Sequence, residues 1–252
     1  MQTIAIISRK GGVGKTATAH ALGAGLHRRG YRVLFVDLDS QGNLSFSTGA
    51  AAGGPTSWDV LAGTADAEDA IAHTQGGDVM PASPSLAGAD ILITGRRKEY
   101  RLRDALQTVA GKYDFCVIDT PTTLGTLTTN ALTAADGAII PAQAEIFSLQ
   151  GIALLRDTVD AVRRSCNPAL KVYGILLTRF NARTVISRDM RDNLEQVAGA
   201  LQTKVYRDAI RECAAVQEAQ ARRQAIYDYA PRRNASRDYA AFVDELLQDI
   251  GG

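Results

Sequence analysis

A glycine-rich stretch directly after the first apolar run constrains the fold of this chain more than any other feature. Residues 3–8 (TIAIIS) have the composition of a buried strand, and residues 11–14 (GGVG) and a helical pattern follow. The glycines let successive backbone N–H groups turn toward an anion, and the N-terminal end of the next helix adds positive potential. We therefore expect an α/β fold with a phosphate site at the end of its first strand.

The stretch SRKGGVGKTAT (residues 8–18) matches the phosphate-binding template G-x-x-x-x-G-K-[ST] except at its first position, where Arg9 stands. In this template the lysine, here Lys15, reaches the β- and γ-phosphates, and the next hydroxyl, here of Thr16, binds Mg²⁺. A second lysine, Lys10, has no role in the template. The predicted phosphate-binding residues are Gly11, Gly12, Val13, Gly14, Lys15, Thr16 and Ala17.

Short apolar runs recur along the chain and alternate with helical patterns. Continuous apolar runs predict strands covered on both faces, and the helical crossovers between them predict a doubly wound, mostly parallel sheet. Such sheets bind their ligands at the carboxyl ends of the strands. The predicted strands are residues 3–8, 32–39, 115–120, 137–143, 172–180 and 204–210.

Two segments outside these runs have a recognisable character. Residues 44–98 are irregular in composition and predict an insertion with short helices, inside one domain that spans residues 1–252. Residues 236–250 predict a helix with Ser236 as its N-cap. The predicted apolar face of that helix consists of Tyr239, Phe242, Leu246 and Leu247.

Three aspartates near predicted strand ends are candidates for metal binding and water activation. Asp119 ends a strand, where it can hold Mg²⁺ through a water molecule; a turn aspartate is the structural alternative. Asp37 and Asp39 lie at the end of another strand. We expect Asp39 to orient the attacking water and Asp37 to support the metal or the loop, unless one of them caps a helix that begins near Gln41.

Four long segments of the chain carry a resemblance to a known family. They are RKGGVGKTATAHALGAGL, VLFVDLDSQGNLS, YDFCVIDTPTTLGTLTTNALTAADGAIIPAQAEIFSLQGI and GILLTRFNART. In this order they resemble the ParA/Soj branch of the deviant Walker A ATPases, which are related to MinD. The resemblance runs through essentially the whole chain and implies a P-loop fold, ATP and Mg²⁺ as cofactors, and slow, switch-like hydrolysis.

The resemblance also implies roles for individual residues. Lys15 and Thr16 bind phosphate and Mg²⁺, Asp39 polarises the attacking water, and Asp119 supports the metal. In this family the lysine at the position of Lys10 crosses the interface of an ATP-sandwiched dimer and contacts the phosphates of the other subunit. Each extra cation there offsets the repulsion between two polyanions. A solvated surface lysine is the alternative interpretation of Lys10.

The chain departs from the family pattern at two places. Thr122 stands where relatives commonly have a second proline, and residues 210–220 (IRECAAVQEAQ) lack both prolines of the corresponding stretch. The contacts to the base are therefore less constrained than the phosphate chemistry. Asn181 is the candidate for adenine recognition, because an amide can both donate to and accept from the base edge; a turn asparagine is the alternative.

The resemblance further implies an ATP-bound homodimer that binds DNA without sequence preference and a ParB-like partner that stimulates hydrolysis. The net charge of the chain is only +1, so a DNA-binding surface must be a local patch. Residues 204–237 have an excess of basic residues, part of which can be solvated helix surface, and residues 95–103 (GRRKEYRLR) are a competing basic run. The candidates for DNA contacts are Arg211, Arg222, Arg223, Arg232 and Arg233.

Other functions remain as alternatives. A MinD-like ATPase that associates with a membrane needs a basic amphipathic helix, but residues 239–252 contain three acidic residues and no lysine or arginine. A ParA-like ATPase that positions a protein cargo is a further alternative. The three cysteines form no C-x-x-C pair, which argues against a cluster-carrying relative, and no additional catalytic constellation supports a ligase.

The ends and the hydropathy of the chain lead to an expected location. No apolar run approaches the roughly 18 residues of a membrane span, and the N-terminal stretch lacks the features of a secretory signal. We expect a cytoplasmic protein without a membrane partner, associated with the nucleoid when it holds ATP. Because the first strand begins at the start of the chain, we expect no sequence-specific operator binding.

Overall fold

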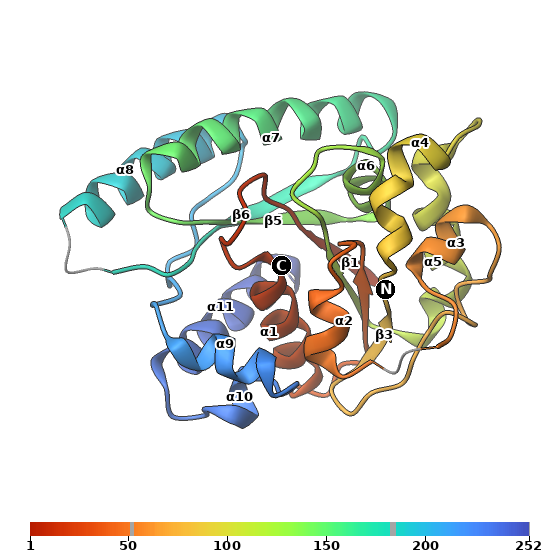
Figure 1. The fold of residues 1–252 in the computed structure, drawn as a ribbon. Helices are drawn as coiled ribbons and strands as arrows, with labels where there is room; N and C mark the ends of the chain where they lie inside the picture. The colour runs from red at the N-terminus through yellow and green to blue at the C-terminus, as the bar shows by residue number, and fades with distance from the viewer. Residues whose placement is uncertain (51–52, 182–184, 252) are drawn as a thin grey trace.

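The fold is that of a computed structural model, in which residues 1–50, 53–181 and 185–251 are described. Its centre is one six-stranded sheet with the strand order β3-β2-β4-β1-β5-β6 (Figure 1). Neighbouring strands are parallel throughout, so the predicted doubly wound, mostly parallel sheet is confirmed. The strands are β1 (Gln2–Ile6), β2 (Val33–Asp37), β3 (Asp78–Met80), β4 (Phe115–Asp119), β5 (Gly137–Ala142) and β6 (Lys171–Leu177).

Helices cover both faces of the sheet (Figure 1). One face is covered by α1 (Lys15–His27), α9 (Ala214–Ala221), α10 (Ile226–Tyr229) and α11 (Asn234–Gly251). The other face is covered by α5 (Arg101–Val109), α6 (Thr126–Ala134), α7 (Ile146–Ser165) and α8 (Val185–Ala200). Because neither face of the sheet meets water, the strands can be apolar on both sides, as their sequences indicate.

The alternation of side chains along each strand divides the apolar interior into two cores. In β1, Ile4 and Ile6 pack with α1 and α11, whereas Ala5 packs on the opposite side. Two glycines allow α1 to lie close to its neighbours. A Cβ atom on Gly23 would lie 2.1 Å from the Phe35 ring, and one on Gly25 would lie 2.7 Å from the Tyr227 hydroxyl.

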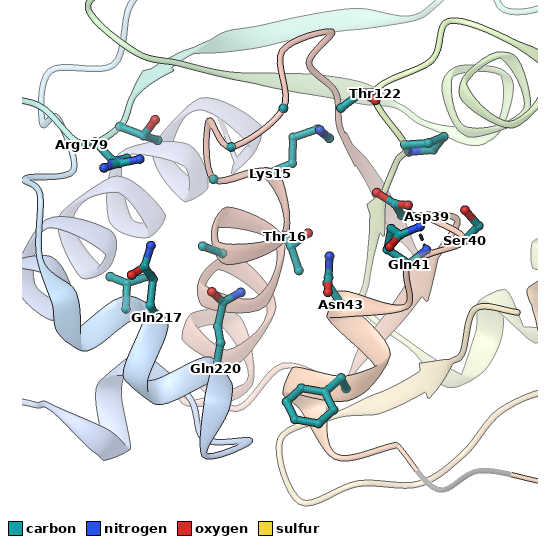
Figure 2. Close-up of a pocket in the computed structure, with 18 of the residues that line it drawn as sticks. Lys15, Thr16, Asp39, Ser40, Gln41, Asn43, Thr122, Arg179, Gln217 and Gln220 are labelled. Carbon is teal, nitrogen blue, oxygen red and sulfur yellow. Dashed lines mark hydrogen bonds between the residues drawn. The ribbon is translucent and has the colours of Figure 1, made fainter. Parts of the chain in front are cut away.

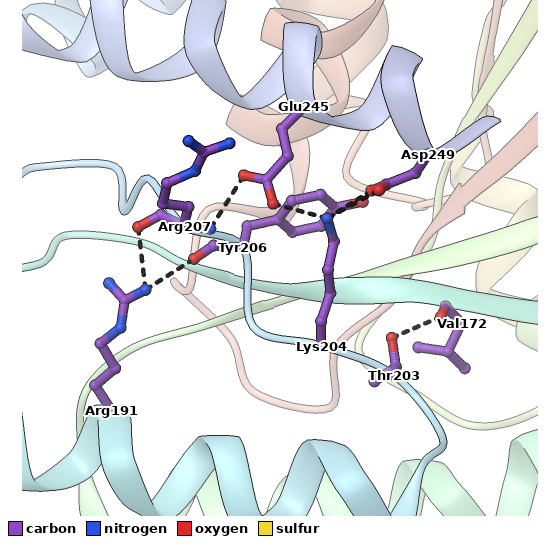
Figure 3. Close-up of polar contacts among 8 residues, drawn as sticks. All are labelled: Val172, Arg191, Thr203, Lys204, Tyr206, Arg207, Glu245 and Asp249. Atoms are coloured by element: carbon purple, nitrogen blue, oxygen red, sulfur yellow. Dashed lines mark hydrogen bonds and ion pairs between the residues drawn. The ribbon is translucent and has the colours of Figure 1, made fainter. Parts of the chain in front are cut away.

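The prediction of a strand at residues 204–210 is wrong. Only Val205 forms a β-bridge, with Ile175, before the segment leaves the edge of the sheet. The next two carbonyl groups, of Tyr206 and Arg207, instead accept hydrogen bonds from the guanidinium of Arg191 on α8, at 3.3 and 3.1 Å (Figure 3). The segment is therefore held from two sides: backbone hydrogen bonds join it to Ile175 and Leu177 of β6, and the Arg191 side chain joins it to α8.

Residues 44–98 contain the expected short helices, α3 (Ser57–Ala62) and α4 (Ala89–Leu92), with α2 (Asn43–Thr48) at their start. They also contain the edge strand β3, which the sequence analysis did not predict because three residues are too few for a recognisable period.

The predicted start of the last helix is wrong as well. Helix α11 begins at Asn234, so Ser236 lies inside its first turn, buried, and is not the N-cap. The expected apolar face is confirmed for Tyr239, Phe242 and Leu246, which are buried in the core. Leu247 is partly buried against that core.

Candidate functional site

A cleft of about 1140 Å³ opens at the carboxyl ends of the strands, where the sequence predicts the ligand site (Figure 2). Figure 2 shows Lys15 and Thr16 between two groups of lining residues, with Asp39, Ser40 and Asn43 on one side and Arg179 and Gln217 on the other. Among the predicted phosphate-binding residues, all but Val13 line the cleft: Gly11, Gly12, Gly14, Lys15, Thr16 and Ala17.

The backbone of the glycine-rich loop has the conformation of an anion-binding nest. Gly12 and Gly14 have left-handed φ angles of 74° and 86°, and Gly14 precedes the first residue of α1. In the described part of the chain, no backbone acceptor takes the N–H groups of Gly12, Val13 or Gly14. The side chain of Val13 is only 1% exposed, so this residue can meet a ligand through its N–H group alone. The loop therefore offers donors to a phosphate and helix α1 adds its positive end.

Lys15 is the cation of this end of the cleft. Its side chain is buried, and burial lowers the pKa of the Lys15 ammonium, while the charges of Asp119 and Asp39 act in the opposite direction. The lysine thus lies among carboxylates with little water around it. In such surroundings its charge interacts more strongly with a phosphate than it would at the protein surface.

Thr16 and Asp119 form the predicted metal-binding pair. The Thr16 hydroxyl donates a hydrogen bond of 2.6 Å to Oδ2 of Asp119, which is fully buried. The other oxygen, Oδ1, has no hydrogen-bond partner among the described residues. Burial, reinforced by the charge of the neighbouring Asp37, raises the pKa of Asp119 to about 8. A buried carboxylate with an unsatisfied oxygen beside a hydroxyl is the donor set that suits a small hard cation such as Mg²⁺.

Asp37 and Asp39 have separate tasks. Asp37 is fully buried at the end of β2 and accepts hydrogen bonds from the Asp39 N–H at 3.1 Å and from the Ser45 N–H and hydroxyl at 2.8 and 2.7 Å. Burial raises the pKa of Asp37 to about 6. The sequence analysis expects Asp37 to support either the metal or the loop, and these contacts show that it supports the loop. A direct contact between Asp37 and a metal stays a prediction.

Asp39 lies beyond the end of β2 and lines the cleft. Its Oδ1 accepts a hydrogen bond of 3.1 Å from the Gln41 N–H, which turns the chain without using the second oxygen. Helix α2 begins at Asn43 with Gly42 as its N-cap, and the Ser45 N–H in its first turn donates to Asp37, so the alternative that an aspartate caps a helix near Gln41 holds for Asp37 and not for Asp39. Asp39 therefore lies in the cleft close enough for its charge to act on Lys15, and its role toward the attacking water stays a prediction.

Lys10 is bound within its own chain. Its ammonium contacts the carboxylate of Glu145, just before α7, and its side chain is 33% exposed. It does not line the cleft. The alternative of a purely solvated lysine therefore does not describe this conformation, and contact with a ligand would require Lys10 to leave Glu145.

The opposite end of the cleft contains residues that sequence reasoning missed. Arg179 and Glu212 line the cleft and bind each other, with 2.7 Å between Nη2 and Oε1. Gln217 and Gln220 on α9 also line it. The position of Arg179 just after β6 is a signal that could have identified it, whereas α9 has no sequence motif. Asn181, the predicted adenine contact, is exposed and does not line the cleft.

Other kinds of site are less well supported. Within residues 1–50, 53–181 and 185–251, no three histidine, cysteine or acidic residues are grouped so that they could hold a metal ion. Cys116, Cys166 and Cys213 are all free thiols. None of the described helices combines the length and the hydropathy that crossing a membrane requires.

Known proteins resemble this chain over nearly its full length. A family model described as an AAA domain matches residues 1–172. The sporulation initiation inhibitor protein Soj of Bacillus subtilis is 39% identical, over 96% of this chain and 97% of that protein. The chromosome partitioning protein ParA of Caulobacter vibrioides is 38% identical, over 98% of this chain and 94% of that protein. The crystal structure of cobyrinic acid a,c-diamide synthase from Mycobacterium smegmatis, with a bound ATP analog and magnesium, has a TM-score of 0.87 and 33% identity, over 100% of this chain and 96% of that one.

Proposed function

This chain belongs to the ParA/Soj family of partition ATPases, and we propose that it hydrolyses ATP slowly to switch between a DNA-bound dimer and a free state. One observation carries the nucleotide part of this proposal. The glycine-rich loop, the buried Lys15 and the contact between Thr16 and Asp119 meet at one end of a cleft large enough for a nucleotide. ATP and Mg²⁺ are the cofactors that these groups suit, and a ParB-like partner is the proposed activator.

The residues of the phosphate end divide the chemistry among themselves. The N–H groups of the loop and the Lys15 ammonium hold the phosphates and neutralise the charge that develops on them during transfer. Thr16 and Asp119 hold Mg²⁺, which when bound supplies positive charge to the β- and γ-phosphate oxygens. Asp39 has one carboxylate oxygen engaged with the Gln41 N–H, and its other oxygen accepts a hydrogen bond from the attacking water and orients it.

The proposed dimer assigns a function to the pair formed by Lys10 and Glu145. In the free chain Glu145 neutralises Lys10, and in the dimer Lys10 exchanges this carboxylate for the phosphates held by the other copy. Glu145→Gln should therefore tighten ATP-dependent dimerisation by about threefold, since it removes a competing surface ion pair. Glu68→Gln is the matched control, because it removes a similar exposed pair, with Lys112, away from the cleft. Equal dimerisation constants for both variants would count against the exchange.

The side-chain contacts reduce the number of residues that are well suited to bind DNA. Arg211 is held by Asp238, and the Arg222 and Arg223 guanidinium groups lie over the rings of Tyr229 and Phe46. Arg232 and Arg233 are exposed, line a surface pocket next to α10, and take part in none of the ion pairs among the described residues. Arg232 and Arg233 are therefore the strongest of the five candidates for contacts to DNA phosphates.

Two other basic regions are less suited to DNA. The ammonium of Lys204 is held between Glu245 and Asp249 of α11, at 2.7 Å from each (Figure 3). In the run 95–103, Arg97 binds Asp104. Arg101 in the same run donates to the carbonyl groups of Leu61 and Thr94. These side chains are committed within the molecule, so they contribute less to a phosphate-binding surface.

A DNA mobility shift with ATP, ADP and no nucleotide tests the proposed function. We expect retention of DNA only with ATP, and binding that weakens as salt is added, because contacts to phosphates release counterions. The double variant Arg232→Gln/Arg233→Gln should lose most of this binding, and Lys204→Gln, the control, should retain it. Binding to anionic vesicles in place of DNA would instead support the MinD-like alternative.

A further inference from the structure

The carbonyl side of the glycine-rich loop is tied to the rest of the protein at three successive residues. The Gly12 carbonyl accepts a hydrogen bond from the Gln143 side chain at 3.2 Å, and the Val13 carbonyl accepts one from the Thr178 hydroxyl at 2.7 Å. The Gly14 carbonyl accepts the first backbone bond of α1, from Thr18 at 2.8 Å. Only the third bond is part of the local helix. The other two come from the side chains of Gln143 and Thr178, which directly follow the carboxyl ends of β5 and β6.

Thr178 is fixed by the sheet before it reaches the loop. It follows the last residue of β6, and its own N–H donates to the Ala142 carbonyl at 2.8 Å. Its side chain is 2% exposed, and its methyl group lies 4.0 Å from the position of a Cβ atom on Gly14. The hydroxyl therefore has a set position under the loop, although it is 165 residues away in sequence.

Because of peptide geometry, the hydrogen bond to the Val13 carbonyl also determines the direction of the Gly14 N–H on the opposite side of the loop. In a trans peptide the C=O and the following N–H point in opposite directions. A hydrogen bond that holds the Val13 carbonyl toward β6 therefore directs the Gly14 N–H away from β6, into the cleft. The same reasoning connects the bond from Gln143 to the Gly12 carbonyl with the direction of the Val13 N–H.

This support matters because the loop has little stiffness of its own. Gly12 and Gly14 have left-handed φ angles, and glycine reaches other backbone conformations at little cost. Each of the two peptides that flank Val13 has one of these glycines on its other side, and such a peptide can rotate unless its carbonyl is held. If it rotates, an inward N–H group is replaced by a carbonyl oxygen, which repels phosphate.

We propose that Thr178 is a positioning residue for phosphate binding, which holds the Val13–Gly14 peptide so that its N–H faces the ligand, with Gln143 in the same role one peptide earlier. The proposal rests on the proposed binding of nucleotide in the cleft. It adds two residues that lie outside the phosphate-loop motif and act through the backbone of that loop. Because the effect is on the polyphosphate, ATP, ADP and inorganic tripolyphosphate should be affected alike.

The test is a calorimetric titration of ADP and of tripolyphosphate into the full chain carrying Thr178→Val. This variant keeps the shape of the side chain and removes the donor, and we expect both ligands to bind about tenfold more weakly. Thr178→Ser keeps the hydroxyl and should bind within about twofold of the wild type. Gln143→Leu, which removes the second support, should also weaken both ligands.

Thr203→Val is the matched control, because the Thr203 hydroxyl donates to the Val172 carbonyl at 2.6 Å, away from the cleft (Figure 3). It should lower the melting temperature and leave both affinities unchanged. Wild-type affinities in both Thr178→Val and Gln143→Leu would overturn the proposal, and so would an equal loss in Thr203→Val. Failure of the wild type to bind ADP would instead refute the proposed function.

Discussion

The two ends of the cleft hold their polar groups in different ways. At the phosphate end, Lys15, Thr16 and Asp119 are placed by strand ends and the first turn of α1, and Asp119 is fully buried. At the opposite end, which we call the base end because we expect the base of a nucleotide there, Arg179 and Glu212 are joined by an ion pair in which both side chains are more than half exposed. The phosphate end is thus built on strand ends and the start of α1, whereas the base end is built on side chains of α9 and of the segments that follow β6 and precede α9.

This difference indicates where the binding energy of a nucleotide should come from. Buried charges interact strongly with a ligand because water does not screen them, whereas exposed ion pairs contribute little. We therefore expect changes at the phosphate end to have large effects on every polyphosphate. Changes at the base end should have small effects, and only on ligands that carry a base.

The largest expected effect is that of Lys15→Ala. Removal of the only buried lysine described at the phosphate end leaves Asp39 and Asp119 facing the phosphates, so affinity for ATP should fall by about a hundredfold or more. Calorimetry measures this loss. Lys112→Ala, at an exposed lysine paired with Glu68, is the control and should bind ATP as the wild type does. If Lys15→Ala lowers the affinity for ATP by less than about fivefold, the phosphate end does not supply most of the binding energy, and the contrast between the two ends is wrong.

The next effect separates hydrolysis from binding. Asp39→Asn retains an oxygen for the Gln41 N–H but weakens the acceptor for the attacking water, so kcat should fall by about a hundredfold. Affinity for ATP should change by no more than about twofold. Steady-state hydrolysis and calorimetry measure the two quantities, and Asp66→Asn, at an exposed aspartate, is the control. Loss of binding with unchanged kcat would assign Asp39 to the ligand rather than to the water.

A pH effect of intermediate size should arise from the helix that supports the phosphate end. Burial lowers the pKa of His20, on α1, to about 4, below the value of about 6.5 for an unfolded chain. The unfolded state therefore binds more protons between these values, so stability is present above about pH 6.5 and is lost as pH falls toward 4.

The His20 contribution should lower the free energy of unfolding by about 2 kcal/mol between pH 7 and pH 5. Chemical denaturation at each pH measures this slope. His20→Leu should change the difference in unfolding free energy between pH 7 and pH 5 by that amount relative to the wild type, and His27→Leu, at an exposed histidine on the same helix, should leave this difference unchanged. Equal slopes in His20→Leu and the wild type would show that the slope has another source.

The smallest expected effect lies at the base end. Arg211 forms a forked pair with Asp238 of α11, and Arg211 lines the cleft. Arg211→Gln should weaken ATP binding by about threefold, because it loosens a segment that lines the end of the cleft where we expect the base, and should leave tripolyphosphate binding unchanged. Exposed Arg237 provides the control, Arg237→Gln. An equal loss for tripolyphosphate would contradict the separation of the two ends.

The sequence allows the phosphate end to be predicted well, because its residues follow from local rules. A strand, a glycine-rich loop and a helix determine where Lys15 and Thr16 lie, and the parallel sheet brings Asp119 beside Asp37 in register. The family resemblance adds the expected order of the remaining segments. The observed sheet agrees with this reasoning except at residues 204–210, which form a single β-bridge to β6 and whose Tyr206 and Arg207 carbonyl groups accept hydrogen bonds from Arg191.

The base end could not be predicted in the same way, because its residues meet only through tertiary packing. Gln217 and Gln220 lie on α9, and nothing in that helix marks them as ligands. The prediction for Asn181 rests on the chemistry of its amide, which does not determine where the side chain lies. The contact of Thr178 with the phosphate loop was missed for the same reason, since its partner is a carbonyl group distant in sequence.

The most direct test of the account is the mass of the protein in solution with Mg²⁺ and a non-hydrolysable ATP analogue, measured by light scattering during gel filtration. The account predicts a species of twice the 26.9 kDa of one chain with the analogue, and one chain with ADP or with the Lys10→Ala variant. A wild-type chain that stays monomeric at a saturating concentration of the analogue would contradict it.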